Sequence, residues 1–171
     1  MTKVIGEHIY LRHISMDDTD LIVKWRNNPR VRNNFIYREV FTPEGHEKWI
    51  NTKVAAGEVV QMIIYEKEGD VPVGSVYLRD IDRAEASAEY GIFIGEDDAL
   101  GKGYGNEAAT LMTDYAAKEL SLKKLILRVF SDNIPALKSY EHAGFHKTED
   151  LLLVECSDGE KRDMIIMEKN L

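Results

Sequence analysis

Apolar residues along the chain recur with a period of two in some segments and of three to four in others, which separates expected strands from expected helices. Residues 8–14 (HIYLRHI) alternate in part and predict a first strand. A helix is expected after Ser15, because Asp18 stands three residues later as in a capping box, and it should end at residues 27–29 (NNP). A second helix is expected from Pro43, because proline is favoured at the first helical position.

From residue 58 onward the pattern is mostly that of strands. The expected elements are, in chain order, strands at 58–67, 71–81 and 87–95, a helix at 106–120, a strand at 124–130, a short helix within 131–145, and a hairpin at 146–169 that turns at 157–159. No repeat or linker divides the chain. The sequence therefore predicts a single α/β (α+β) domain over residues 1–171.

The composition is that of an ordinary globular protein. Its 171 residues are 44% hydrophobic and 30% charged, and no stretch approaches the roughly 20 apolar residues that a membrane helix needs. The N-terminal residues lack the apolar core of a signal peptide, so we expect a cytoplasmic protein. Cys156 is the only cysteine, which excludes an internal disulfide and fits a small buried strand residue. The net charge of −8 argues against a nucleic-acid binder.

Charge is unevenly distributed along the chain. Residues 24–38 contain no acid and carry the basic side chains Lys24, Arg26, Arg30, Arg32 and Arg38. Residues 80–98 contain Arg83 as their only base and carry the acids Asp80, Asp82, Glu85, Glu89, Glu96, Asp97 and Asp98. Either run is compatible with a solvated surface, and charge alone identifies no ligand.

Three glycines precede the helix expected at 106–120: Gly101, Gly103 and Gly105. Glycine costs roughly 0.5–1 kcal/mol relative to alanine inside a regular element, so their clustering needs a reason. At a helix N-terminus, unpaired backbone N–H groups and the helix dipole favour an anion such as a pyrophosphate, and Lys102 would add charge beside it. The pattern matches neither the P-loop nor the dinucleotide fingerprint. We therefore expect a different pyrophosphate ligand, with a flexible turn as the alternative.

A second candidate site lies at 132–145 (DNIPALKSYEHAGF). Asn133 stands where an expected strand ends and a helix begins, and Ala136 and Tyr140 share one helical face. A phenol, with an ordinary pKa of about 10, suits protonation of a departing thiolate. Read alone, Tyr140 fits a core aromatic residue equally well. None of the histidines forms a convincing cluster with other ligands, and no metal site is expected.

Three segments together resemble the GNAT superfamily of acetyl-CoA-dependent N-acetyltransferases: 71–82 (VPVGSVYLRDID), 88–108 (AEYGIFIGEDDALGKGYGNEA) and 127–145 (LRVFSDNIPALKSYEHAGF). The chain is similar to the branch that holds ribosomal-protein N-terminal, spermidine and nucleotide-amino-sugar acetyltransferases, which the early KWRNNPRVR and the late DGEKRDMIIME also suit. The resemblance covers nearly the whole chain. It implies a twisted, mostly antiparallel sheet flanked by helices, whose strands bearing Ile92 and Val129 run parallel and separate to form a cofactor cleft.

The resemblance also implies which residues bind acetyl-CoA, the expected co-substrate. The family's pyrophosphate loop falls on residues 100–105, with Leu100 in place of the usual Arg or Gln. The preceding strand would pair with the pantetheine arm, and Asn133 would hydrogen-bond that arm. The expected cofactor-binding residues are Ile92, Phe93, Ile94, Leu100, Gly101, Lys102, Gly103, Tyr104, Gly105, Asn133 and Ala136.

By the same resemblance, Tyr140 occupies the position of the general acid that protonates the coenzyme A thiolate. Glu89 is the candidate base for attack by a neutral amine, with Glu85 as the next choice. Because the first two helices line the acceptor side in such folds, the expected substrate-binding residues are Trp25, Arg26, Asn27, Arg30 and Arg32. Arginines favour a phosphorylated or carboxylated acceptor, whereas the acids at 80–98 favour a polycation. Trp25 fits a core position as well.

The sequence thus predicts an N-acetyltransferase that uses acetyl-CoA and acts on a small-molecule amine, an amino sugar or a protein N-terminus. A polyamine acetyltransferase and a non-catalytic acyl-CoA-binding module are the alternatives. Neither a nucleic acid nor a membrane is an expected partner. A homodimer is one option, formed through residues 163–168 (DMIIME), which would offer a long apolar strand edge.

Overall fold

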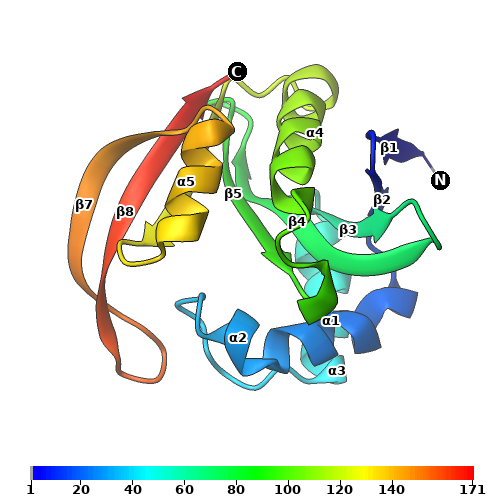
Figure 1. Cartoon of the computed structure of the whole chain (residues 1–171), viewed down its shortest axis with the longest axis horizontal. Coiled ribbons are helices and arrows are strands. Elements are labelled where there is room, and N and C mark those ends of the chain that lie inside the picture. Colours follow the sequence, from blue (N-terminus) through cyan, green and yellow to red (C-terminus); the bar gives the residue numbers. More distant parts are fainter. Residues whose placement is uncertain (1) are drawn as a thin grey trace.

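A twisted sheet of eight strands forms the centre of the computed structural model, which describes residues 2–171 (Figure 1). In chain order the strands are β1 (Lys3–Ile5), β2 (Ile9–His13), β3 (Val60–Glu66), β4 (Val71–Asp82), β5 (Ser87–Ile94), β6 (Lys124–Phe130), β7 (His146–Glu155) and β8 (Lys161–Asn170). Their spatial order is β1-β2-β3-β4-β5-β6-β8-β7, and every neighbouring pair is antiparallel except β5 and β6. The expected mixed, mostly antiparallel sheet is confirmed.

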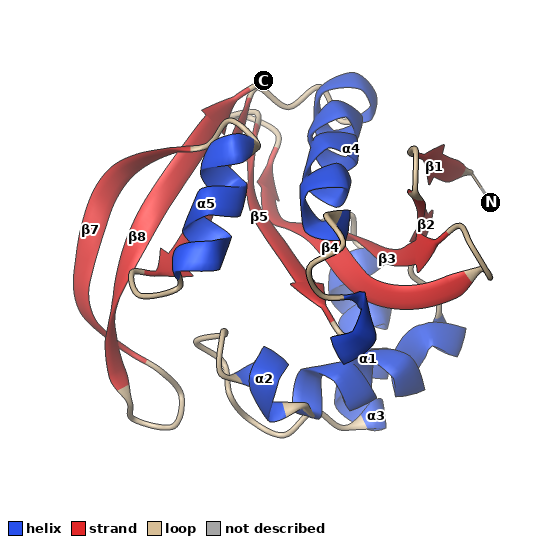
Figure 2. Cartoon of the chain, viewed as in Figure 1, coloured by secondary structure: helices blue, strands red, loops and turns tan. Residues whose placement is uncertain are grey.

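Helices flank this sheet (Figure 2). They are α1 (Thr19–Asn27), α2 (Pro29–Arg32), α3 (Pro43–Trp49), α4 (Tyr104–Glu119) and α5 (Ile134–His142), with 3-10 turns at Met16–Asp18 and Asp97–Ala99 and a π-helical turn at Ile50–Val54. Figure 1 shows α4 and α5 on either side of β5, and α1, α2 and α3 grouped together.

The two faces of the sheet bury separate clusters of apolar side chains. On one face, Met62 and Ile64 of β3 belong to the cluster that includes Met112 of α4. On the other face, Ile63 packs in the cluster that includes Ile22 of α1. Alternate residues of one strand point to opposite faces, so a strand covered on both faces is apolar throughout.

Every element expected from the sequence is present, and two short ones were missed. Asp18 accepts a hydrogen bond from the backbone N–H of Ser15 at 2.8 Å, as a capping box requires, although a 3-10 turn precedes α1. Thr42 caps α3 by accepting a hydrogen bond from the backbone of Gly45. β1 and α2 contain three and four residues, too few to display a period.

β5 and β6 are paired over only part of their length. Their parallel ladder runs from Ser87 opposite Lys124 to Glu89 opposite Ile126. β5 nevertheless continues to Ile94, still paired with β4 on its other side, and β6 continues to Phe130. The expected separation of the two central strands is therefore present, and it leaves one side of β5 without a strand partner.

The expectation of an exposed apolar edge at residues 163–168 is wrong. These residues belong to β8, which is paired with β6 on one side and with β7 on the other. The edge strand is β7, which exposes Leu152 and Leu153. Cys156 is buried as expected, but it lies just beyond the end of β7. Within residues 2–171, no helix is long and apolar enough to cross a membrane.

Candidate active site

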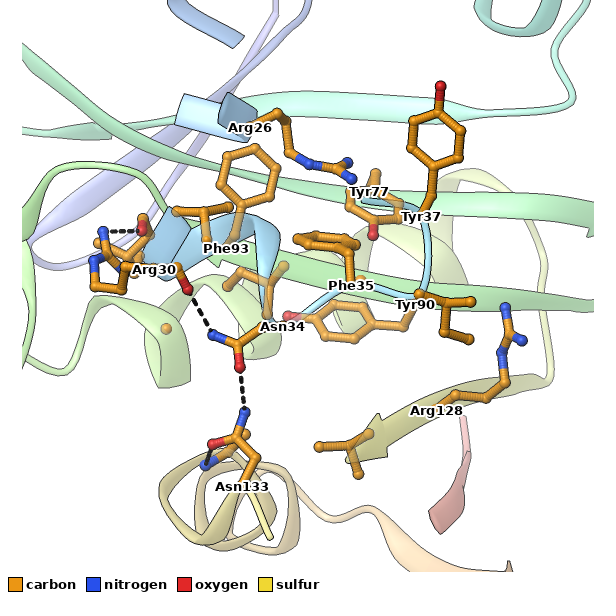
Figure 3. A pocket seen from close by; sticks show the side chains of 18 of the residues that line it. Arg26, Arg30, Asn34, Phe35, Tyr37, Tyr77, Tyr90, Phe93, Arg128 and Asn133 are labelled. Carbon is orange, nitrogen blue, oxygen red and sulfur yellow. Dashed lines mark hydrogen bonds between the residues drawn. The ribbon is translucent and has the colours of Figure 1, made fainter. Parts of the chain in front are cut away.

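A cavity of about 970 Å³ lies where β5 and β6 separate (Figure 3). Most of the expected site residues line it: Arg26, Arg30, Glu89, Ile92, Phe93, Ile94, Leu100, Gly101, Gly103, Gly105, Asn133, Ala136 and Tyr140. The expected residues that do not line it are Trp25, Asn27, Arg32, Lys102 and Tyr104. The sequence therefore predicted most of the expected residues at this cavity correctly as neighbours, while five of them lie outside its lining.

The glycine-rich segment forms one end of the cavity. Gly101 and Gly103 have φ angles of +75° and +81°, a region that other residues rarely adopt, and Gly103 is the N-cap of α4. A Cβ atom at either position would meet nothing within 4 Å, so no neighbouring group fills that space. The first N–H groups of α4 therefore lie beside an open, side-chain-free space, an arrangement that suits a bound anion.

Two residues of this segment turn away from the cavity. The Nζ of Lys102 lies 3.8 Å from a carboxylate oxygen of Glu66. Tyr104 is buried in the core cluster beneath α4. Any contribution of this loop to anion binding therefore comes from its backbone rather than from these two side chains.

α5 forms another wall and is tied to two neighbouring elements. Asn133 caps the helix by accepting a hydrogen bond from the backbone of Ala136 at 3.4 Å, and its Nδ2 lies 3.5 Å from the Oδ1 of Asn34 (Figure 3). Ser139 donates a hydrogen bond to Asn106 in the first turn of α4. These contacts fix the start of α5 relative to the glycine segment.

Tyr140 lies on α5 in an aromatic wall of the cavity. Its ring packs edge to face against Tyr90 of β5 and against Phe145, with centroids 6.2 Å and 6.0 Å apart. Burial, together with nearby Tyr77, raises the pKa of Tyr140 above its ordinary value. The phenol keeps its proton at neutral pH, as an acid catalyst requires, although its raised pKa makes it a weaker acid than an ordinary phenol.

Glu89 lies at the end of the β5–β6 ladder, between two arginines. Its carboxylate accepts hydrogen bonds from the Nε of Arg79 at 2.7 Å and from the Nε of Arg128 at 2.8 Å. Burial alone would raise the pKa of Glu89, but the two arginines outweigh burial and hold the pKa below its ordinary value. Such a carboxylate is a weak base, so the geometry favours a role in positioning the two arginines over the expected catalytic role.

Arg26 reaches the cavity from α1 between aromatic rings. Its guanidinium carbon lies 3.7 Å from the ring centroid of Phe35 and 4.3 Å from that of Phe41. Burial lowers the pKa of Arg26 to about 10, so the side chain stays charged at neutral pH. Figure 3 shows the guanidinium beside Tyr77 and Tyr37. Arg26 therefore lines the cavity, and its role in binding a substrate stays a prediction.

Three of the other expected substrate residues, Trp25, Asn27 and Arg30, have structural partners. Trp25 is only 1% exposed and donates from Nε1 to Glu96 at 2.9 Å, so it is a core residue rather than a cavity residue. Asn27 forms two hydrogen bonds with the backbone of Phe41, one of 2.9 Å as donor and one of 2.7 Å as acceptor. Arg30 lines the cavity but is paired with Asp97 at 2.6 Å.

The model of the acetyltransferase (GNAT) domain family matches residues 8–146, which include the split strands, the glycine segment and Tyr140. The chain belongs to the GNAT acetyltransferase family. It is accordingly an N-acetyltransferase, as the sequence predicts.

Individual relatives are consistent with this membership. The chain is 32% identical over 152 residues to the uncharacterized protein MJ1062 of Methanocaldococcus jannaschii, covering 86% of this chain but only 30% of that protein's length. It is 30% identical over 149 residues to the probable N-acetyltransferase YjcK of Bacillus subtilis, covering 83% and 82% of the two chains. A spermidine N-acetyltransferase from Vibrio cholerae, solved with CoA and spermine, has a TM-score of 0.88 at 23% identity over 96% of both chains. That structural likeness shows a shared fold.

Sequence reasoning missed several residues that line the cavity of this GNAT protein. Arg79 and Arg128 lie in two of the segments that resemble the family, but the sequence singled out neither, because only the pairing of β4, β5 and β6 brings them together around Glu89. Phe35 and Phe41 lie in the segment between α2 and α3, for which the sequence gives no period. One signal was available: the acid-free run at 24–38 is interrupted by aromatic residues, a pattern compatible with stacked guanidinium groups.

Proposed function

We propose that this GNAT N-acetyltransferase binds acetyl-CoA along the split between β5 and β6 and transfers the acetyl group directly to the amine of a small molecule. The observation that carries the proposal is one cavity that contains the glycine segment, the unpaired side of β5, Tyr140 and Arg26. It offers a place for a pyrophosphate, an extended arm, a thioester and an acceptor in a single space.

The residues at the glycine end fit the cofactor. The space beside Gly101 and Gly103 is open, and the N-terminus of α4 supplies backbone donors for a pyrophosphate. Leu100 lines the cavity and is 46% exposed, so an apolar side chain stands where the family usually has a cation or an amide. Asn133 has its side chain at the cavity and can donate to the cofactor arm once its long contact to Asn34 is given up.

The reaction proceeds by direct attack. A neutral amine nitrogen forms a bond to the thioester carbonyl carbon, and the carbon–sulfur bond then breaks. The departing thiolate takes a proton from the Tyr140 hydroxyl, the proton lost by the amine passes to solvent, and solvent returns a proton to the Tyr140 phenolate. The protein mainly contributes orientation of the two reactants within one cavity, which removes much of the entropic barrier.

The charge of the cavity favours an acceptor that is not a polycation. The ionisable lining residues, within the part of the chain that the structure describes, include Arg26, Arg30, Arg79 and Arg128 but only one acid, Glu89. The other acids of the 80–98 run do not line the cavity. Polyamine acetylation remains the second candidate, because the structurally similar Vibrio cholerae enzymes act on spermidine.

The test is release of coenzyme A thiol from acetyl-CoA over a panel of amino sugars, amino acids, short peptides and spermidine. Tyr140→Phe should lower kcat by about 100-fold on the accepted amine, because it removes the acid without changing ring packing. Tyr115→Phe, a tyrosine outside the cavity, serves as the matched control. Equal rates in Tyr140→Phe and wild type would refute the assigned acid. Binding of acetyl-CoA without any turnover would favour the non-catalytic module instead.

A further inference from the structure

We propose that Arg26 is the binding site for an oxyanion of the acceptor, so that preferred acceptors are amines that also carry a carboxylate or a phosphate. This inference rests on the proposed function and names its substrate class. It is carried by three observations: the aromatic clamp on Arg26, the absence of a counter-charge for it, and its place in the cavity.

Three aromatic rings lie close to the guanidinium of Arg26. Phe35 and Phe41 stack at 3.7 Å and 4.3 Å from its central carbon, and Phe93 is 5.9 Å away. The guanidinium carbon lies over the rings of Phe35 and Phe41, and a cation at such distances is attracted to the ring face. The N–H donors lie in the plane, at the edge, and this fixed fork matches the two oxygens of a carboxylate or phosphate.

Arg26 lacks the partner that other cavity arginines have. Arg30 is paired with Asp97, and Arg79 and Arg128 share Glu89. Among residues 2–171, no hydrogen bond or ion pair to the side chain of Arg26 is found, and its Nε is buried without an acceptor. A buried charge without a counter-charge is costly, and cation–π contacts offset only part of that cost. A bound oxyanion would supply the missing charge.

The position of Arg26 assigns this anion to the acceptor rather than to the cofactor. Figure 3 shows Arg26, Tyr77 and Tyr37 on one side of the cavity and Asn133 on the other. Asn133 begins α5, and Ser139 of the same helix is bonded to the first turn of α4, which marks that side as the cofactor end. An anion at Arg26 therefore belongs to the second substrate.

The first experiment measures anion binding without catalysis. The melting temperature of wild type is followed in low-salt buffer with increasing glutarate in one arm and inorganic phosphate in the other. We expect saturable stabilisation by at least one of them in wild type and in Arg83→Met, an exposed control charge, and its loss in Arg26→Met. Arg26→Lys keeps the charge but not the fork and should bind at least tenfold more weakly, which tests the site even if Arg26→Met does not fold. Equal stabilisation of wild type and both Arg26 variants would overturn the proposal, and so would no stabilisation of wild type.

The second experiment compares acceptors that differ only in the anion. Matched pairs are an amino acid against its amide and glucosamine 6-phosphate against glucosamine, assayed by thiol release. Wild type should favour the anionic member, and Arg26→Lys should lower that preference at least tenfold, while Arg83→Met should keep it. Turnover with no preference for either anion would overturn this inference and leave the proposed function standing. Arg26-dependent anion binding without turnover of any amine would instead support the site and count against the proposed function.

Discussion

Glu89 accepts hydrogen bonds from two arginines at the cavity, and replacing it tests whether its role is structural or catalytic. Replacing it by glutamine keeps the size of the side chain but removes the charge that Arg79 and Arg128 share. Because the carboxylate accepts from both arginines at 2.7 Å and 2.8 Å, the variant leaves Arg128 without its counter-charge and Arg79 with only the exposed Asp80, 3.9 Å away. We expect the main effect to be on stability, since the lowered pKa of Glu89 makes it a weak base.

The magnitude follows from the exposure of the three side chains, which is 17% for Glu89, 36% for Arg79 and 35% for Arg128. Removing one partner of a fully buried pair costs roughly 3–5 kcal/mol, and an exposed pair contributes about 1 kcal/mol or less. The intermediate burial gives a loss of about 2 kcal/mol for Glu89→Gln. In a protein of this size, that corresponds to a fall in Tm of roughly 4–8 °C.

The pH dependence has a definite sign. A carboxylate whose pKa is lowered by folding stabilises the folded state above its unfolded pKa, and this contribution is lost as the pH falls through the folded value. The stability difference between wild type and Glu89→Gln should therefore be full at neutral pH and shrink below the ordinary value of 4.5. Urea unfolding between pH 3.5 and 7.5 measures it, with exposed Glu149→Gln as the control. An unchanged free energy of unfolding, together with a 100-fold fall in kcat, would refute this reasoning and restore Glu89 as the catalytic base.

Two further predictions concern the glycine segment and α1. Gly103→Ala places a side chain at φ +81° and should lower the free energy of unfolding by about 1–2 kcal/mol. It should also weaken acetyl-CoA binding measured by calorimetry. Unchanged affinity would show that the loop is not part of the cofactor site. Trp25→Phe removes the 2.9 Å hydrogen bond to Glu96 and should lower the free energy of unfolding, measured in urea, by about 1 kcal/mol. A change in KM for the amine without a change in stability would show instead that Trp25 contributes to the acceptor site.

The path of the chain was predictable wherever a local signal existed. Ser15 with Asp18, Pro43 and the three glycines each act on their own neighbourhood, and the structure forms helix starts at these places. The core face of α4 was likewise visible in its apolar spacing, and Met112 is fully buried. Such features depend on residues a few positions apart, which the sequence displays directly.

What could not be predicted depends on register and on side-chain partners. Whether Trp25 faces the cavity or the core is decided by the position of Glu96, which lies 71 residues later. The sequence does not reveal that Glu89 is paired, because its two partners come from different strands. The apolar run of β8 indicated an edge, but β8 is paired with β6 on one side and with β7 on the other, and the run itself does not reveal this pairing.

The split between β5 and β6 amounts to a strand edge enclosed within the protein. Exposed strand edges recruit other chains and promote aggregation, and proteins usually blunt them with charge, proline or a cover. Residues 91–94 (GIFI) carry none of the blunting residues, and the walls from α4 and α5 serve as the cover. The fold thus leaves one side of β5 without a strand partner, and the walls around the cavity cover that edge as proteins cover other strand edges.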